Sequence, residues 1–258
     1  MIFESHAHYD DKQFAKDRDE LLSSMKENGI ETIINVGTNI YSSQKTIELT
    51  KQYDLIYGAI GVHPSDISCL NEDRFEWLKG QCHLPKVVAI GEIGLDYYWD
   101  KEVEVRECQK VWFKRQLELA REVKLPVIIH SRDAAQDTLD LMKQQDAQEI
   151  AGVIHCFSYS EEMAAEYIKM GYYIGIGGVV TFPNAKKIKE AVKKIPIERI
   201  LLETDCPYLA PMPNRGKRNT SLYIPYIAEE IAQIKEITVE EVVAITNKNA
   251  RALFKKVQ

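Results

Sequence analysis

Short apolar runs alternate along the whole chain with longer amphipathic segments. The runs are rich in Val, Ile and Ala and contain few polar positions, which is typical of parallel strands that are buried on both faces. Turn signals such as Asn28-Gly29 and Ile195-Pro196 lie where the pattern changes. The pattern predicts eight strands, at residues 1–6, 31–36, 55–62, 86–92, 126–130, 151–155, 172–177 and 199–204.

The segments between the runs are predicted helices. The clearest is residues 102–122, where apolar side chains recur at spacings of three and four. Two more helices are expected after the last strand, at about 219–235 and 238–255. Eight strands with intervening helices favour an α/β fold of the closed TIM (β/α)₈ barrel type. An open doubly wound sheet is the main alternative, but neither of its phosphate-loop signatures is present in the sequence.

The length of the chain agrees with one such barrel. Its 258 residues match the roughly 250 residues of a typical (β/α)₈ barrel. The sequence contains no internal repeat, low-complexity tract or linker. We therefore expect residues 1–258 to form a single (β/α)₈ barrel hydrolase domain.

Composition narrows the class of protein further. The five cysteines are odd in number and form no Cys-x-x-Cys, so disulfides are not expected and a cytoplasmic location is predicted. No apolar run approaches the ~20 residues of a membrane span, and the first residues do not resemble a signal peptide. A net charge of −6 argues against a broad basic face that coats nucleic acid. It is compatible with a pocket in which divalent ions help to hold a few phosphates.

Side chains that commonly bind metals follow five of the predicted strands. The first strand ends in His-Ala-His, and an acid or a histidine follows the fourth, fifth, sixth and eighth strands. Packing a core requires none of these residue types, whereas the carboxyl ends of barrel strands meet on one face. The expected metal ligands are His6, His8, Glu92, His130, His155 and Asp205. This is the pattern of a metal hydrolase.

The ligand types suggest two divalent ions. In a strand, residues two apart point to the same side, so His6 and His8 can reach one ion together with Asp205. Glu92 has two oxygens and can bridge this ion to a second one held by His130 and His155. Mixed imidazole and carboxylate ligands suit Zn²⁺, Mn²⁺ or similar ions better than an all-oxygen Mg²⁺ cage, although the identity of the ions stays open. Asp205 is the expected catalytic residue that orients or deprotonates a metal-activated water.

Two further polar residues are candidates for catalysis. Glu203 precedes Asp205 by two positions and is expected to orient a ligand from inside the barrel, with an isolated interior ion pair as the alternative. His63 follows the third strand at the same face. We expect it to contact substrate or the transition state, and a structural hydrogen bond is the alternative.

Substrate contacts are expected from two arginines and an aromatic segment. Arg132 and Arg215 can hold phosphates, and a solvated basic loop is the alternative. Arg215 lies in the long loop 207–219 that follows the last strand. The aromatic segment Tyr97-Tyr98-Trp99 can stack on bases beside the site, with Tyr97 as the expected substrate-binding residue; loop aromatics that simply pack are the alternative.

Seven short motifs together resemble the TatD family of metal-dependent hydrolases, often called TatD DNases, over essentially the whole chain. They are Ser5-His6-Ala7-His8, Gly61-Val62-His63-Pro64, Gly91-Glu92-Ile93-Gly94-Leu95-Asp96-Tyr97-Tyr98, His130-Ser131-Arg132, His155-Cys156-Phe157-Ser158, Glu203-Thr204-Asp205-Cys206-Pro207-Tyr208-Leu209-Ala210-Pro211 and Arg215-Gly216-Lys217-Arg218-Asn219. The resemblance implies a (β/α)₈ barrel, a divalent-metal centre with the six ligands above, and roles for His63 and Glu203. It also implies phosphodiester hydrolysis on DNA, with 3′→5′ exonuclease action in some members.

The sequence thus predicts a metal-dependent hydrolase of ester bonds, most simply a deoxyribonuclease acting on DNA ends or single-stranded DNA. Neither a membrane nor an obligate protein partner is expected. An amidohydrolase-like C–N or carboxylic-ester hydrolase with the same binuclear centre is the alternative. A non-catalytic barrel stabilised by metal is less consistent with ligands at the carboxyl ends of the strands, the functional face of such barrels.

Overall fold

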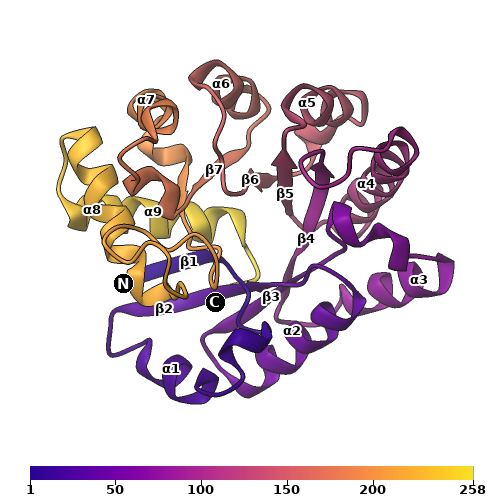
Figure 1. Cartoon of the computed structure of the whole chain (residues 1–258). Coiled ribbons are helices and arrows are strands. Elements are labelled where there is room, and N and C mark those ends of the chain that lie inside the picture. Colours follow the sequence, from indigo (N-terminus) through magenta and orange to yellow (C-terminus); the bar gives the residue numbers. More distant parts are fainter. Residues whose placement is uncertain (258) are drawn as a thin grey trace.

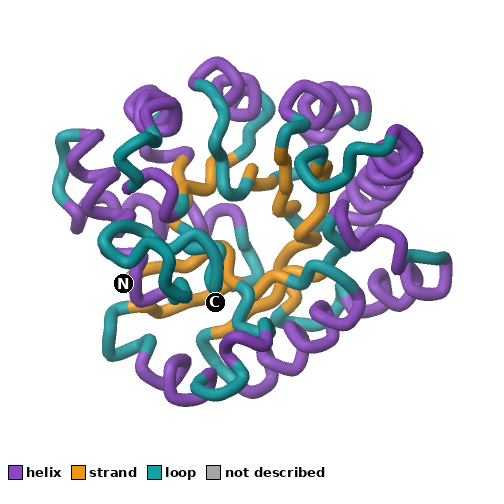
Figure 2. The backbone as a smooth tube through the Cα atoms, in the orientation of Figure 1, coloured by secondary structure: helices purple, strands orange, loops and turns teal. Residues whose placement is uncertain are grey.

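The computed structural model describes residues 1–257, in which eight parallel strands form a barrel surrounded by helices (Figures 1 and 2). All eight predicted strands are confirmed. Only the fourth differs from its prediction by more than two residues, because it continues to Asp96. The strands are β1 (Ile2–Ala7), β2 (Ile30–Val36), β3 (Ile56–Ile60), β4 (Val87–Asp96), β5 (Val127–Arg132), β6 (Gly152–Ile154), β7 (Tyr173–Ile176) and β8 (Ile200–Leu202).

The sheet runs in sequence order from β1 to β8, and every adjacent pair is parallel. The first and last strands meet just beyond β8, where Ala7 and Cys206 form a parallel bridge. The His8 backbone N–H donates to the Cys206 carbonyl at 2.8 Å, and that of Asp205 donates to the His6 carbonyl at 3.0 Å. The expected closed TIM barrel is therefore confirmed, and its closure brings residue 205 beside residues 6 and 8.

The helices lie outside the strands. The helix expected at 102–122 is α4, and the two expected at the end of the chain are α8 and α9. None of the helices in residues 1–257 has both the length and the apolar character that crossing a bilayer demands. The helices are α1 (Arg18–Ser24), α2 (Ile40–Gln52), α3 (Glu72–Gln81), α4 (Val103–Val123), α5 (Ala135–Gln144), α6 (Glu161–Lys169), α7 (Lys186–Lys194), α8 (Ile224–Lys235) and α9 (Val239–Leu253).

Two buried glutamines of α4 fix the ends of neighbouring strands. The Gln116 side-chain amide accepts from the Val62 N–H at 2.8 Å and donates to the Val62 carbonyl at 3.0 Å. Gln109 pairs in the same way with the peptide groups of Asp96, at 3.0 and 3.1 Å. These amides satisfy backbone groups that have no strand partner where β3 and β4 end. They hold in place the residues from which His63 and the segment after Asp96 project.

A separate apolar cluster fills the other end of the barrel. It takes side chains from seven of the eight strands, so it can only lie inside the barrel. Residues from the end of the chain close this cluster, and the rings of Phe3 and Phe254 stack with centroids 5.9 Å apart. We call this end the floor and the end formed by the carboxyl ends of the strands the mouth.

Candidate metal centre

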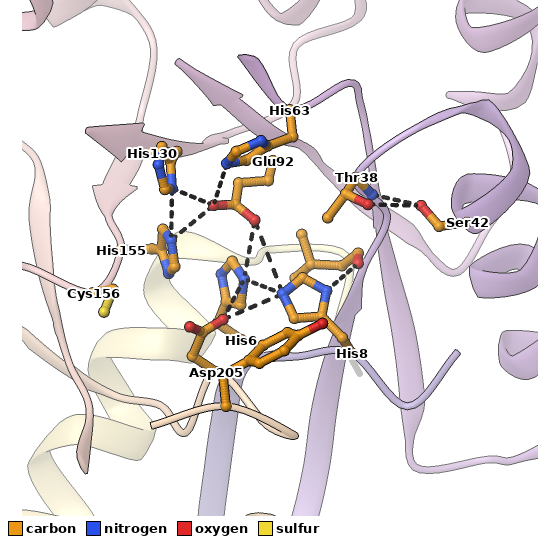
Figure 3. Close-up of polar contacts among 12 residues, drawn as sticks. His6, His8, Thr38, Ser42, His63, Glu92, His130, His155, Cys156 and Asp205 are labelled. Atoms are coloured by element: carbon orange, nitrogen blue, oxygen red, sulfur yellow. Dashed lines mark hydrogen bonds and ion pairs between the residues drawn. The ribbon is translucent and has the colours of Figure 1, made fainter. Parts of the chain in front are cut away.

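The six predicted ligands converge at the mouth (Figure 3). His6 lies in β1 and His8 directly follows it, while Glu92 lies in β4 and His130 in β5. His155 follows β6 directly, and Asp205 lies three residues after β8. Figure 3 shows their side chains pointing toward one another around the Glu92 carboxylate.

One group of ligand atoms surrounds Glu92 Oε2. The Nε2 atoms of His6 and His8 are 3.1 Å apart, and they lie 3.5 and 3.9 Å from that oxygen. Asp205 Oδ1 completes the group, 3.7 Å from His6 Nε2 and 3.3 Å from His8 Nε2. The set brings together the four residues that were predicted to share one ion.

The other Glu92 oxygen faces a second group. Glu92 Oε1 lies 2.7 Å from His130 Nδ1 and 2.8 Å from His155 Nε2, and these two nitrogens are 3.4 Å apart. The carboxylate of Glu92 therefore stands between the two groups with one oxygen in each. This is the arrangement that the sequence predicted for a bridging ligand.

The hydrogen bonds on the far sides of two rings indicate which nitrogens are free to bind a cation. His8 Nδ1 lies 2.8 Å from the Val36 carbonyl, which can only accept, so Nδ1 carries a proton and Nε2 is the nitrogen that can bind a cation once its own proton is lost. His130 Nε2 lies 3.2 Å from Asp96 Oδ2, which leaves His130 Nδ1 facing Glu92. Such outward hydrogen bonds are typical of metal-binding histidines. Lone pairs and carboxylate oxygens this close require positive charge between them, so the residues fit divalent cations.

The pKa shifts of the site describe the same need for positive charge. Burial disfavours the ionised form of Glu92, but the charge of His155 and hydrogen bonds from His130 and His155 hold its pKa well below the usual range. Burial likewise opposes protonation of His8, yet the hydrogen bond and charge of Asp205 raise its pKa to about 9. Protons on the imidazoles thus neutralise the carboxylates when no cation does so. Binding of metal is expected to release them.

Glu203 lies beneath the second group. Its Oε1 accepts from the backbone N–H of Cys156 and lies 3.6 Å from His155 Nδ1. The side chain is fully buried, and a Cβ on Gly175 of β7 would lie 2.2 Å from Glu203 Oε2. Glycine at this position therefore makes room for the carboxylate. His6, His155 and Glu203 also have ligand atoms within 4.8 Å of one another, as do His63, Glu92 and His130.

A pocket of about 660 Å³ opens above these groups. His63 and Arg132 both line it, whereas Tyr97 and Arg215 are absent from its lining in the described residues. The Tyr97 hydroxyl donates to Asp137 Oδ2 at 2.8 Å, and the Arg215 guanidinium lies 4.4 Å from the Phe182 ring centre. Tyr97 and Arg215, which were predicted to contact substrate, thus contact other residues of the protein outside the pocket.

Asp96 also lies at the site, although no role was predicted for it from the sequence. One carboxylate oxygen faces His130, and the other accepts from the backbone N–H groups of Tyr98 and Trp99, at 2.9 and 3.2 Å. Asp96 is four residues after Glu92 in the same strand. The period of two along a strand was therefore a usable signal for its orientation.

Comparison with known proteins agrees with this geometry. The family model described as TatD related DNase matches residues 3–255. A Bacillus subtilis protein named as the uncharacterized metal-dependent hydrolase YabD is 46% identical and is covered over 99% of both chains. A Citrobacter rodentium protein named 3′-5′ ssDNA/RNA exonuclease TatD is 34% identical over 98% of this chain and 97% of its own. The crystal structure of YJJV, a TatD homologue from Escherichia coli K12, superposes with a TM-score of 0.92 at 29% identity over 98% of both chains.

Proposed function

Because the chain belongs to the TatD family of metal-dependent hydrolases, we propose that it hydrolyses phosphodiester bonds of DNA at strand ends or in single strands. The name of the Citrobacter relative, an exonuclease of single-stranded DNA and RNA, supports this choice of substrate. The observation that carries the proposal is the Glu92 carboxylate, which presents one oxygen to each of two ligand groups below the pocket.

The proposed metal centre would hold two divalent ions. Glu92, His6, His8 and Asp205 would hold one, and Glu92, His130 and His155 would hold the other. When bound, such ions would lower the pKa of a water and offset the negative charge of a phosphate group. The four imidazoles favour Zn²⁺ or Mn²⁺ over Mg²⁺.

Two side chains, Asp205 and His63, have proposed roles that follow from their surroundings. Burial opposes ionisation of Asp205, but the hydrogen bond from His8 keeps its pKa below the usual range, so it can orient water as a carboxylate. Burial, and then the nearby His130, lower the pKa of His63 to about 3. Its Nδ1 accepts from the Ser65 N–H at 3.2 Å, which leaves an N–H on Nε2 beside the pocket. A neutral His63 can therefore donate a hydrogen bond to a phosphate oxygen.

Glu203 and Arg132 are also assigned roles. Glu203 is a positioning residue that holds the backbone after His155. Arg132 brings a fixed positive charge to the pocket wall, where it can contact a phosphate of the substrate. The residues thus divide into those that hold cations, those that orient water and those that bind the strand.

A hydrolase of amides or carboxylic esters is the second candidate, and one observation favours it. Among the described residues that line the pocket, Arg132 is the one lysine or arginine, whereas Asp66, Glu92, Asp96 and Asp205 are acids. A long polyanion such as DNA would find only one positively charged side chain in the pocket before it reached the metal centre. A small neutral substrate would not depend on such cations.

The test is to strip the purified protein of metal, restore Zn²⁺, Mn²⁺ or Mg²⁺ separately, and assay four kinds of substrate. These are a labelled single-stranded oligonucleotide, its duplex, a phosphodiester dye, and a panel of esters and amides. We expect the single strand to shorten only with metal. The Asp205→Asn variant, purified in parallel, should be inactive and thereby excludes a contaminating nuclease. Hydrolysis confined to amides or carboxylic esters would overturn the proposal in favour of the second candidate.

A further inference from the structure

Two aromatic side chains just after β4 are exposed instead of being packed in the core. Trp99 is 67% exposed and Tyr98 is 45% exposed. Trp99 lines the same pocket as the candidate ligands His130, His155 and Asp205. Ligand pockets are commonly lined by aromatic side chains together with a few polar groups, and Trp99 gives this pocket such a ring.

The segment that carries these rings is held in place. Asp96 Oδ1 accepts from the backbone N–H groups of Tyr98 and Trp99, at 2.9 and 3.2 Å. On α4, Gln109 donates to Asp100 Oδ2 at 2.8 Å and Arg106 donates to the Asp100 carbonyl at 2.9 Å. The rings are therefore exposed on a fixed backbone, which lowers the entropy lost when a ligand binds them.

Arg132 lies against this pair from the neighbouring strand β5. Its guanidinium carbon is 3.9 Å from the Tyr98 ring centre and 5.6 Å from that of Trp99. Within residues 1–257 no carboxylate lies within ion-pair distance of Arg132, and Arg132 too lines the pocket. Its charge is thus oriented by aromatic rings and is available to an anion. The Tyr98 and Trp99 rings are themselves perpendicular, with an interplanar angle of 87° and centroids 4.7 Å apart.

Tyr97, the residue that the sequence favoured for stacking, has a different environment. Its hydroxyl donates to Asp137 of α5, and the guanidinium of Arg106 lies 4.4 Å from its ring centre. These contacts tie Tyr97 to the helix layer. The contrast within three consecutive residues identifies Trp99 and Tyr98 as the rings left available.

We propose that Trp99 and Tyr98, together with Arg132, form a binding site for an unpaired nucleobase and its adjoining phosphate. The base stacks on the exposed indole, and the phosphate contacts the guanidinium on the way to the metal centre. A base in a duplex is already paired and stacked between neighbours, so this site selects single strands or frayed ends. The inference rests on the proposed phosphodiesterase function and assigns that function's substrate class to named side chains.

The first experiment compares single-stranded oligonucleotides that have normal or abasic terminal nucleotides, with metal-loaded enzyme. Trp99→Ala should raise KM for the normal strand roughly 10- to 100-fold, the effect expected from loss of one stacked base. It should leave KM for the abasic strand almost unchanged. Tyr41→Ala is the matched control, because Tyr41 is 68% exposed on α2 and is outside the pocket lining.

The second experiment measures binding without turnover. A single strand added to metal-free protein should quench tryptophan fluorescence through Trp99, since Trp77 and Trp112 pack against the core. Trp99→Phe should bind the strand but lose the quench. The abasic strand should quench the native protein weakly.

The outcomes separate this inference from the proposed function. If the native enzyme hydrolyses no phosphodiester, the proposed function fails. If it cleaves DNA while Trp99→Ala retains native KM for normal strands, the stacking inference fails and the function stands. Equal loss of activity on normal and abasic strands would also overturn the inference, because it would indicate general damage to the site.

Discussion

The floor and the mouth of the barrel are built from different side chains. At the floor, Phe3, Leu201 and Phe254 belong to an apolar cluster in which each is at most 2% exposed. At the mouth, residues of equal burial are charged or titratable, including His6 and Glu203. Burying such groups costs free energy unless they are paired. The comparison indicates that apolar packing at the floor stabilises the fold, whereas the buried polar groups at the mouth lower its stability and serve function.

The backbone shows the same contrast. Four non-glycine residues with φ between 45° and 59° lie in loops after strands at the mouth: Asp133, Cys156, Asp205 and Leu209. The other three, Lys124, Asp146 and Glu236, lie at the ends of helices, where this conformation is common. Left-handed backbone costs roughly 1–3 kcal/mol for such residues and is concentrated at functional sites. Asp205 therefore reaches the ligand group from a strained position.

The largest expected effect comes from replacing Glu92 at the mouth. Glu92→Gln keeps the shape but replaces an oxygen with an amide donor and removes the charge that faces the histidines of both groups. We expect kcat/KM to fall by about 10³-fold or more, with loss of bound metal. Thermal unfolding should still show a cooperative transition near that of the metal-free native protein. Activity within tenfold of native at saturating metal would contradict the assignment of Glu92.

A substitution at the floor should instead lower stability and leave activity unchanged. Phe254→Ala removes a fully buried ring stacked on Phe3, and we expect about 3–5 kcal/mol of destabilisation in urea unfolding. The activity of each folded molecule should stay native. Val111→Ala on the exposed face of α4 is the control and should cost less than about 0.5 kcal/mol. A selective fall in kcat with little loss of stability would show that the two ends are not independent.

A buried acid in β1, Glu4, tests how polar burial affects stability. Burial raises the pKa of Glu4 to about 8, against hydrogen bonds from Thr204, the His6 backbone and Ser221. In the unfolded chain this acid has its ordinary pKa of 4.5, so between these pH values the folded state holds a proton that the unfolded state has lost. The free energy of unfolding should therefore fall as pH rises from about 4.5 to about 8, by about 1.4 kcal/mol per pH unit at most.

Glu4→Gln should remove this dependence. The amide can accept from the backbone N–H groups of His6 and Thr204 and donate to the hydroxyls of Thr204 and Ser221. Relative to that of the native protein, the free energy of unfolding of the variant should rise by a few kcal/mol between pH 4.5 and about pH 8. Urea unfolding at pH 5, 6.5 and 8.5 measures the difference. Parallel stability curves for the two proteins would rule out a raised pKa at Glu4.

The smallest expected effect concerns the link between Asp96 and His130. Asp96→Asn can still accept from the N–H groups of Tyr98 and Trp99, but it loses the charge that faces His130 Nε2. We expect metal affinity or kcat/KM to fall by roughly 10- to 100-fold, while the fluorescence quench by a single strand persists. Asp66→Asn, another acid of the pocket lining, is the matched control. An equal loss in both variants would indicate a general effect of pocket charge.

The order and type of the strands could be predicted because they depend on local pattern. An apolar run buried on both faces has the same signature wherever it lies, and residues two apart on a strand share a side. The candidate ligands could be predicted for the same reason, since each follows such a run. His6 and His8 needed only their spacing, and Asp205 needed only the expectation that the barrel closes.

The sequence by itself thus determined the succession of elements and the residue types at the strand ends. Tertiary structure decided which atoms face one another: His8 Nδ1 faces the Val36 carbonyl, and the backbone N–H of Trp99 donates to Asp96. It also turned Tyr97 toward Asp137 and left Arg132 beside Tyr98. The physical reason is that the spacing of residues along a strand determines which face of the sheet each side chain points to. The orientation of a loop side chain depends on hydrogen bonds with residues distant in the sequence.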